Sequence, residues 1–337
     1  MPNSTEDQFL GALLGMAIGD ALGAPVTGLS RAEIADRFGT IDRYHGAALP
    51  DAAEVNPGEF TDETEFALCI VESMTVNRGV FDPDTAGVRL LHLAAGPSRR
   101  WMHPGTREAL DAAAETLEFQ APLREDDEAT GDVAARGVPI GLISAVGRFD
   151  GERFWSEVEA VVRLTHGAPA AINAAAAMAY GTWLAATGAE RRGWARQTAD
   201  FLGGGELAAR LETVDRLIAA GEALETILEQ TGTGLDAVEA APAAFAAAMT
   251  TPVFEDAVFA VIAAGGATDT GGALTGALAG AAGGASGIPQ GLIDGLEGRI
   301  YISLAGPWFY KAARQRAGQL IDLRPVHGAR PDLPPRQ

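Results

Sequence analysis

A glycine recurs at every fourth position in the segment GGATDTGGALTGALAGAAGG, which runs from Gly265 to Gly284. The repeated positions are Gly272, Gly276, Gly280 and Gly284. Residues four apart lie on one face of an α-helix, so the segment predicts a helix with a stripe that lacks side chains. Such a stripe lets another helix or a ligand approach the backbone closely. We expect helix packing at Gly280 and Gly284, whereas at Gly272 and Gly276 a packed helix and a bound ligand fit the pattern equally well.

Helical patterns dominate the rest of the chain. Ala, Leu and Glu are common, and alternating runs of Val, Ile and Thr are scarce, which favours helices over strands. Thr5 and Gln8 form a capping-box pattern that predicts a first helix ending near Gly23. A second helix is predicted to have Thr61 as its N-cap and to end before Gly79. Further helices are predicted over residues 84–95, 105–117, 133–147, 151–164, 168–187, 190–203, 206–220, 235–249, 253–264, 269–283 and 290–318, and residues 38–60 are predicted to be irregular, with a short strand or a loop over a site.

The sequence shows no internal linker or repeat. Hydrophobic residues make up 47% of the 337 positions, which is enough for a substantial core. We therefore predict one compact all-α domain over residues 1–325, followed by a Pro-rich tail over residues 326–337.

The chain is acidic, with 45 Asp and Glu residues against 25 Lys and Arg residues and a net charge of −20. This charge repels phosphate backbones and anionic membrane surfaces, so we expect no nucleic acid and no membrane as partner. The N-terminus lacks the basic start of a signal peptide, and Asp20 interrupts its apolar stretch. The single cysteine, Cys69, lies in an apolar run and is expected to be a buried, inert thiol. We expect a cytoplasmic monomer.

Two short segments place hydroxyl and carboxyl side chains at predicted helix starts. The first is Thr-Asp-Glu-Thr at residues 61–64, and the second is Thr-Asp-Thr at residues 268–270. Plain N-capping explains either segment alone, because Thr and Asp satisfy the free N–H groups of a first turn. Two such segments, each beside an apolar helix, favour a shared site. Carboxylates and hydroxyls bind hard cations such as Mg²⁺, so a metal site is one interpretation.

Five motifs resemble those of the ADP-ribosylglycohydrolases and occur in the same order. GALLGMAIGDALGAPV at residues 11–26 resembles the opening helix of that family, and FTDETEFAL at residues 60–68 resembles its Thr-Asp-Asp-Thr metal motif. GDVAARGVPIGL at residues 131–142 is similar to its Asn-Gly-Ala-x-Met-Arg-x-x-Pro-x-Gly segment. LTHGAPAAINAAAA at residues 164–177 resembles its Thr-His motif, and the segment that begins at Gly265 resembles its Gly-Gly-Asp-x-Asp-Thr motif. The resemblance covers most of the chain.

The resemblance implies an all-α domain with a binuclear Mg²⁺ or Mn²⁺ site that cleaves a glycosidic bond to ADP-ribose. It assigns Thr61, Asp62, Asp269 and Thr270 as metal ligands. Several family residues are replaced in this chain: a Glu by Thr27, an Asp by Ala267, an Asp by Glu63, an Asn by Gly131 and a Met by Ala135. Three of the five acids of the full site remain, and binding two divalent ions without matching carboxylates is costly. We therefore expect one Mg²⁺ or Mn²⁺ ion.

The resemblance also suggests which residues react with or bind the substrate. We predict that Glu63 and Asp62 take part in catalysis. The predicted substrate-binding residues are Gly131, Asp132, Arg136, His166, Gly271 and Gly272, of which the last two glycines would let a ribose or diphosphate lie against a helix start. Asp132 is unusual in its motif and would replace one lost acid, although an N-cap role explains it more simply. Asp20 is expected to support the site.

The segment RRWMHPG contains Arg99, Arg100, Trp101 and His103. These side chains are able to stack on or clamp a ligand. A solvated basic loop is the simpler interpretation, and we expect it here.

Three functions fit these residues. The first is a hydrolase that cleaves the N-glycosidic bond of an ADP-ribosyl or ribosyl substrate, a small molecule or an ADP-ribosylated protein, with a carboxylate-activated water. The second is a lapsed enzyme that binds ADP-ribose or a nucleotide without turnover, because acids are missing at Thr27 and Ala267. The third is a riboside hydrolase that acts on a free small molecule in a biosynthetic pathway. The retained Asp62 and Asp269 favour the hydrolases.

Overall fold

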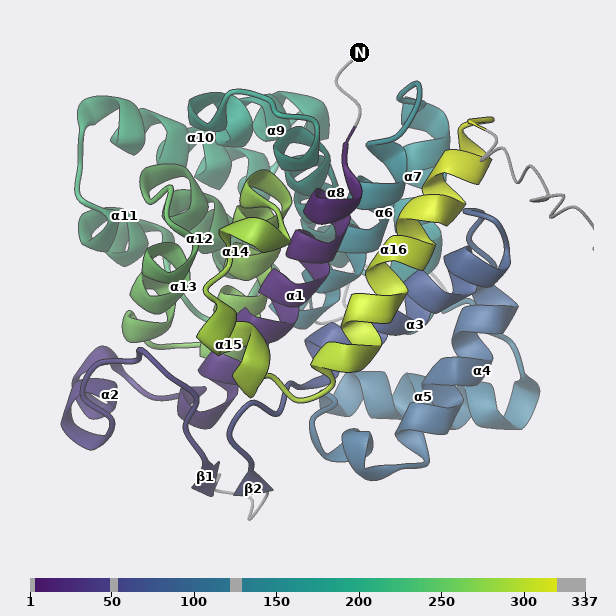
Figure 1. The fold of residues 1–337 in the computed structure, drawn as a ribbon, viewed down its shortest axis with the longest axis horizontal. Helices are drawn as coiled ribbons and strands as arrows, with labels where there is room; N and C mark the ends of the chain where they lie inside the picture. Colours follow the sequence, from purple (N-terminus) through teal and green to yellow (C-terminus); the bar gives the residue numbers. More distant parts are fainter. Residues whose placement is uncertain (1–3, 49–53, 122–128, 320–337) are drawn as a thin grey trace, which may run out of the picture.

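The computed structural model describes residues 4–48, 54–121 and 129–319, and these residues are mostly helical (Figure 1). The described helices are α1 (Glu6–Gly23), α2 (Arg31–Arg37), α3 (Asp62–Val76), α4 (Pro83–Ala94), α5 (Pro104–Thr116), α6 (Gly137–Ser144), α7 (Gly151–Val162), α8 (Pro169–Ala186), α9 (Trp194–Leu202), α10 (Glu206–Ala220), α11 (Leu224–Thr231), α12 (Ala237–Thr250), α13 (Phe254–Ala263), α14 (Thr268–Gly283), α15 (Gln290–Gly295) and α16 (Arg299–Arg316). The strands β1 (Ala47–Ala48) and β2 (Glu54–Val55) form one antiparallel pair. The predicted all-α class is confirmed.

Helices α1 and α14 lie antiparallel in the core of the fold (Figure 1). A Cβ atom added at Gly276 would lie 2.0 Å from the carbonyl oxygen of Gly15, and one added at Gly272 would lie 2.2 Å from that of Gly19. The glycines that bring the two backbones into direct contact are Gly11, Gly15, Gly19 and Gly23 in α1 and Gly272, Gly276 and Gly280 in α14, with Gly284 just beyond it. The expected packing at Gly280 and Gly284 is confirmed. At Gly272 and Gly276 the partner is a helix.

Other helices surround this central pair. Helices α12 and α13 pack against α14, while α16 packs against both α1 and α3. The segment 6–26, which includes α1, is long and apolar enough to cross a membrane by length and composition, but 94% of its apolar window is buried inside the fold. It is the core helix of this structure. Cys69 is buried in α3, as predicted.

Most helix boundaries match the predictions. Thr5 begins α1 with the predicted capping box, in which its side chain and that of Gln8 each accept a hydrogen bond from the other's backbone N–H. The predicted helix over residues 290–318 is instead two helices, α15 and α16, because Gly298 between them has a left-handed φ of 72°. Helices α2 and α11 were not predicted, and each is only two turns long. Within residues 38–60 the strands β1 and β2 form the short antiparallel pair, and residues 49–53 and the Pro-rich tail lie outside the described residues.

Candidate functional site

The first turns of α3 and α14 meet near the C-terminal end of α1. The hydroxyl of Thr270 donates to Glu63 Oε1 at 2.6 Å, which links the two helix starts directly. Thr61 Oγ1 lies 2.5 Å from the other carboxylate oxygen of Glu63. The side chain of neither N-cap residue, Thr61 or Ala267, accepts a hydrogen bond from its own helix, so the Thr61 hydroxyl is not a plain N-cap. The predicted meeting of the two helix starts is confirmed.

Asp20 on α1 holds the start of α3 in place. It is fully buried and accepts hydrogen bonds from the backbone N–H and hydroxyl groups of both Thr61 and Thr64. Burial raises the pKa of Asp20 to about 7 despite these bonds. Because the Thr61 hydroxyl has one proton, its contacts with both Asp20 and Glu63 require a proton on one of the two carboxyl groups. Asp20 therefore orients α3 from behind the site.

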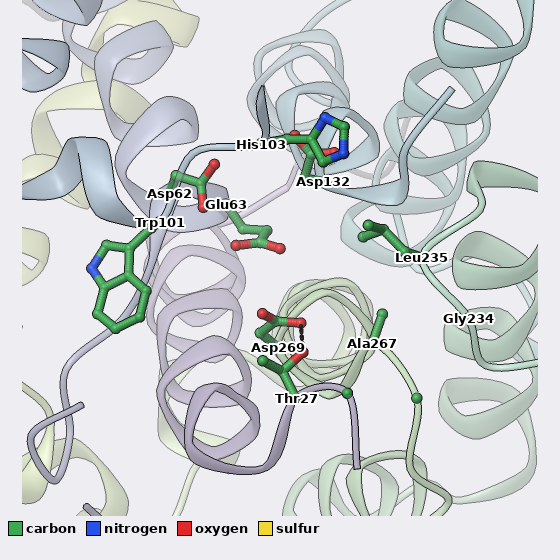
Figure 2. Close-up of a pocket in the computed structure, with 12 residues that line it drawn as sticks. Thr27, Asp62, Glu63, Trp101, His103, Asp132, Gly234, Leu235, Ala267 and Asp269 are labelled. Atoms are coloured by element: carbon green, nitrogen blue, oxygen red, sulfur yellow. Dashed lines mark hydrogen bonds between the residues drawn. The ribbon is translucent and has the colours of Figure 1, made fainter. Parts of the chain in front are cut away.

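A cavity of about 400 Å³ lies beside the two helix starts (Figure 2). In Figure 2, Asp62 and Glu63 approach it from α3, and Asp269 lies on the opposite side of it. The full lining is Thr27, Gly28, Asp62, Glu63, Trp101, His103, Asp132, Gly234, Leu235, Gly266, Ala267 and Asp269. Two carboxylates predicted to bind metal, Asp62 and Asp269, thus share one cavity.

Thr27 and Ala267 stand where the resembled family has acids. The Thr27 hydroxyl donates to Asp269 Oδ1 at 2.8 Å (Figure 2), and the backbone N–H of Thr270 donates to the same oxygen at 2.8 Å. Ala267 lines the cavity with a methyl group. A short hydroxyl and a methyl group therefore replace two carboxylates, and the Thr27 hydroxyl helps to orient Asp269.

Acidic side chains are concentrated in the cavity. Burial raises the pKa values of Asp62 and Glu63 well above the usual range, and neighbouring carboxylates raise them further. Burial also raises the pKa of Asp269, against hydrogen bonds that lower it. Neither Lys nor Arg is among the described residues that line the cavity. The site therefore favours a cation or a positively charged group.

Carboxylate and hydroxyl oxygens meet at this cavity and at the two helix starts beside it. In the described part of the chain, no group of three or more Asp, Glu, His or Cys side chains is arranged to hold a metal ion. Asp62 and Asp269 supply two carboxylates, and Thr61 and Thr270 add hydroxyl oxygens that keep lone pairs while their protons bind carboxylates. Oxygen atoms of these two kinds are the ligands that hard cations prefer.

A second cavity of about 400 Å³ adjoins the first, and His103 lines both. His166 lines this second cavity, with its Nδ1 2.8 Å from Thr165 Oγ1. The buried Arg136 donates to the same hydroxyl oxygen at 2.5 Å and lies over the ring of Phe66. His166 therefore lines the second cavity, and the buried Arg136 lines neither, although the charges of Asp132 and Asp62 in the first cavity act on its guanidinium.

Three glycines predicted to bind substrate line neither cavity. The N–H of Gly131 donates to the carbonyl of Leu235 at 2.6 Å, so it is used within the fold. Gly272 packs against Gly19 of α1, and Gly271 is buried. Packing accounts for Gly131 and Gly272, and these positions do not support the predicted contacts with substrate. Of the six predicted substrate-binding residues, Asp132 lines the first cavity and His166 the second.

Trp101 and His103 line the first cavity, contrary to the expected solvated loop. The two arginines before them do lie away from the cavity. Arg99 pairs with Asp111, and Arg100 pairs with Glu59. The sequence signal for a binding role was an aromatic residue close to a histidine. The adjacent arginines favoured a loop exposed to solvent instead.

His166 is expected to make stability depend on pH. Burial, followed by the nearby Arg136, lowers the pKa of His166 to about 4, whereas an unfolded histidine titrates near 6.5. Between these values the unfolded chain binds a proton that the folded chain does not, so stability falls as pH falls. From pH 7 to pH 5 this loss is about 2 kcal/mol. Urea unfolding at both pH values should show a smaller loss for His166→Asn than for wild type.

A matched control for this prediction is His92→Asn, because His92 is exposed on α4. This variant should keep the wild-type difference in unfolding free energy between pH 7 and pH 5. An unchanged pH dependence in His166→Asn would show that His166 does not remain neutral in the folded protein.

The chain resembles known proteins in sequence and in fold. The ADP-ribosylglycohydrolase family profile matches residues 1–327. The chain is 29% identical over 268 residues to the Escherichia coli protein YegU, covering 71% of this chain and 76% of that protein. It is 31% identical over 176 residues to the ADP-ribosyl-(dinitrogen reductase) glycohydrolase of Rhodospirillum rubrum, covering 49% of this chain and 53% of that enzyme. A solved structure described as an ADP-ribosylglycohydrolase-related protein complex superposes with a TM-score of 0.69 at 28% identity, covering 91% of this chain and 98% of that one. The chain therefore belongs to the ADP-ribosylglycohydrolase family.

Proposed function

We propose that this protein hydrolyses the N-glycosidic bond between the anomeric carbon of an ADP-ribosyl or ribosyl group and a nitrogen of its leaving group. The observation that carries this proposal is the meeting of Asp62, Glu63 and Asp269 in one cavity between two helix starts. Membership of a hydrolase family that includes an enzyme named for ADP-ribosyl removal supports it.

The residues of the cavity suit this reaction. As the bond from C1 to nitrogen breaks, positive charge develops on the ribose ring, and the carboxylates of Asp62 and Asp269 stabilise it. The bonding electrons leave with the nitrogen. Asp62 accepts a proton from the attacking water while the water oxygen bonds to C1, and that proton then passes to the leaving nitrogen. General-base help of this kind is typically worth ~10²–10⁴-fold.

Glu63 acts differently in this proposal. Both of its carboxylate oxygens contact threonine hydroxyls, one from each helix start. It therefore fixes Thr61 and Thr270 relative to each other. The predicted catalytic role of Glu63 becomes one of positioning, in which the residue acts through these two hydroxyls.

We also propose one Mg²⁺ or Mn²⁺ ion, held by Thr61, Asp62, Asp269 and Thr270. When bound, such an ion polarises ribose oxygens as a Lewis acid. These four residues supply the oxygen ligands, and the hydrogen bond from the Thr27 hydroxyl orients the carboxylate of Asp269.

Metal content tests the single-ion proposal. After equilibration with Mn²⁺ and dialysis, elemental analysis should find one ion per wild-type chain. The double variant Thr27→Glu, Ala267→Asp should bind two, because it returns two carboxylates to the cavity wall. Each single change should do less, since shared ligands are not additive. Two ions in the wild type would show that the described residues supply ligands beyond those named here.

The hydrolase proposal is tested by product release. ADP-ribosyl-arginine and simple N-ribosides are incubated with the protein and Mg²⁺ or Mn²⁺, and the free sugar is measured by chromatography. Release well above the uncatalysed rate is expected for at least one substrate. Tight binding of these ligands with no release would instead support the lapsed enzyme, which is favoured by the methyl group at Ala267.

A further inference from the structure

Helix α16 presents a stripe of large apolar side chains to solvent. Ile300, Leu304 and Trp308 recur every four residues, so they lie on one face of the helix. Their exposed fractions are 69%, 62% and 56%. The opposite face, with the buried Phe309 and Ala313, packs against the rest of the fold, and α16 lies on the near side of the molecule in Figure 1. Large apolar side chains grouped on a surface mark a place where another molecule docks.

The two ends of this stripe carry opposite charges at equal spacing from its centre. Lys311 follows Leu304 by seven residues, which is two helical turns, and its ammonium group lies 4.4 Å from the centre of the Trp308 ring. Glu297 precedes Leu304 by seven residues and is exposed just before α16 begins. Among the described residues, neither Glu297 nor Lys311 has an ion-pair partner. Each charge is therefore available to a molecule that covers the stripe.

The shape of the stripe is also self-complementary. A hollow of about 260 Å³ lies at its C-terminal end, and Pro307, Trp308 and Lys311 are among the residues that line it. At its N-terminal end, the exposed Ile300 projects into solvent. Ile300 and Trp308 lie four residues before and after Leu304. A two-fold rotation about Leu304 thus brings the projecting side chain of one copy to the hollow of another.

In place of the monomer expected from the sequence, we propose that α16 forms the interface of a homodimer. The two copies of this helix pack antiparallel about a two-fold axis at Leu304. In this arrangement Glu297 of each chain faces Lys311 of the partner subunit, as an isologous interface requires. A parallel arrangement would instead set equal charges against each other. The proposal is independent of the proposed hydrolysis.

Other occupants of the stripe match its charges less well. An anionic membrane surface repels a chain of net charge −20, and Glu297 would face that surface at one end of the stripe. A uniformly acidic partner would meet the same carboxylate. A second copy supplies an ammonium group for Glu297 and a carboxylate for Lys311, so both ends are matched at once.

Sedimentation velocity of the full chain tests the dimer, at protein concentrations from about 1 to 100 μM, which suit a weak specific interface. Wild type should sediment as a reversible dimer. Leu304→Glu should raise the dissociation constant at least about a hundredfold, because it puts two carboxylates at the centre of the contact. Leu117→Glu is the matched control, since Leu117 is 63% exposed at the end of α5, and it should dimerise like wild type. A wild type that stays monomeric, or a Leu304→Glu variant that dimerises equally well, would overturn the proposal.

Reversal of the charges tests the antiparallel arrangement. Glu297→Lys and Lys311→Glu should each weaken the homodimer about tenfold, because both contacts become repulsive. In an equimolar mixture of the two variants, the mixed dimer has opposite charges at both ends and should recover an affinity near that of wild type. A mixture that associates no better than either variant alone would overturn the arrangement.

A zero-length cross-link locates the contact directly. Lys311 is the only lysine in the sequence, so an amide that a carbodiimide forms with its side chain is easily assigned by mass spectrometry. Within one chain Glu297 and Lys311 are 14 positions apart, roughly 20 Å along a helix, which is too far for this link. A link between them is expected in wild type and should be lost in Leu304→Glu. A monomer whose Lys311 is linked to Asp332 of its own chain, or that sediments with anionic vesicles, would give the stripe another occupant and overturn the dimer.

Discussion

Gly276→Ala is expected to destabilise the protein severely. A Cβ atom at this position would lie 2.0 Å from the carbonyl oxygen and 2.7 Å from the carbonyl carbon of Gly15. Both atoms belong to the backbone of α1, so no side-chain rotation relieves the clash and the two central helices must separate. Overpacking typically costs 1–3 kcal/mol, and a backbone clash at the centre of the fold places this variant at about 3 kcal/mol or more. Urea unfolding measures the loss.

Gly283→Ala is the control on the same helix. Gly283 is exposed, and a Cβ atom there would meet nothing within 4 Å. Because alanine favours helix over glycine by about 1 kcal/mol, this variant should be as stable as wild type or more stable. If Gly276→Ala were as stable as Gly283→Ala, the direct contact of the α1 and α14 backbones would be wrong.

Asp62→Asn is expected to lower the rate of N-glycoside hydrolysis by ~10²–10⁴-fold. The amide has nearly the same shape as the carboxylate. It neither accepts the proton of the attacking water nor stabilises the positive charge that develops on the ribose. Turnover of the fastest wild-type substrate, measured at saturating substrate and fixed Mg²⁺, gives the loss directly.

Glu65→Gln is the control for Asp62→Asn. Glu65 lies in the same first turn of α3, but its carboxylate accepts a hydrogen bond from Ser98 and does not line the cavity. Its rate should stay close to that of wild type. A comparable loss in both variants would indicate a general disturbance of α3, and full activity in Asp62→Asn would remove Asp62 from the chemistry.

The central helix pair was partly predictable from the sequence. The glycine stripe in α14 predicts close packing on one face of this helix, but on its own it does not identify the partner helix. Gly11, Gly15, Gly19 and Gly23 also recur every four residues. Two equal repeats on two apolar helices predict backbone contact between them, and the facing glycines of the structure follow this order in opposite directions. A local reading of one helix could not identify its partner.

The site was predictable in its residue types but not in its contacts. Threonines and acids at two helix starts predicted that the starts would meet, and the contact between Thr270 and Glu63 confirms it. The directions of the hydroxyls were not predictable, because they depend on the buried Asp20 and on Glu63, which lies between the two helix starts. The bond from Thr27 to Asp269 joins residues 242 positions apart. No local sequence pattern predicts a hydrogen bond between residues so far apart along the chain.

The walls of the cavity were the hardest part to predict. Trp101 comes from a loop whose arginines suggested solvent, and Leu235 comes from the segment before α12. Such residues enter a site through packing of distant segments, whereas helix starts carry their own sequence signals. Gly271 and Gly272 were predicted to bind substrate because they follow Asp269 in the sequence. Neither lines the cavity.

The most direct measurement is a crystal structure of Asp62→Asn grown with Mn²⁺ and the riboside that the wild type hydrolyses fastest. We predict an intact substrate with its C1 atom in the cavity between α3 and α14, facing residue 62 and Asp269. A substrate bound elsewhere, with this cavity filled only by water, would contradict the proposed site of hydrolysis.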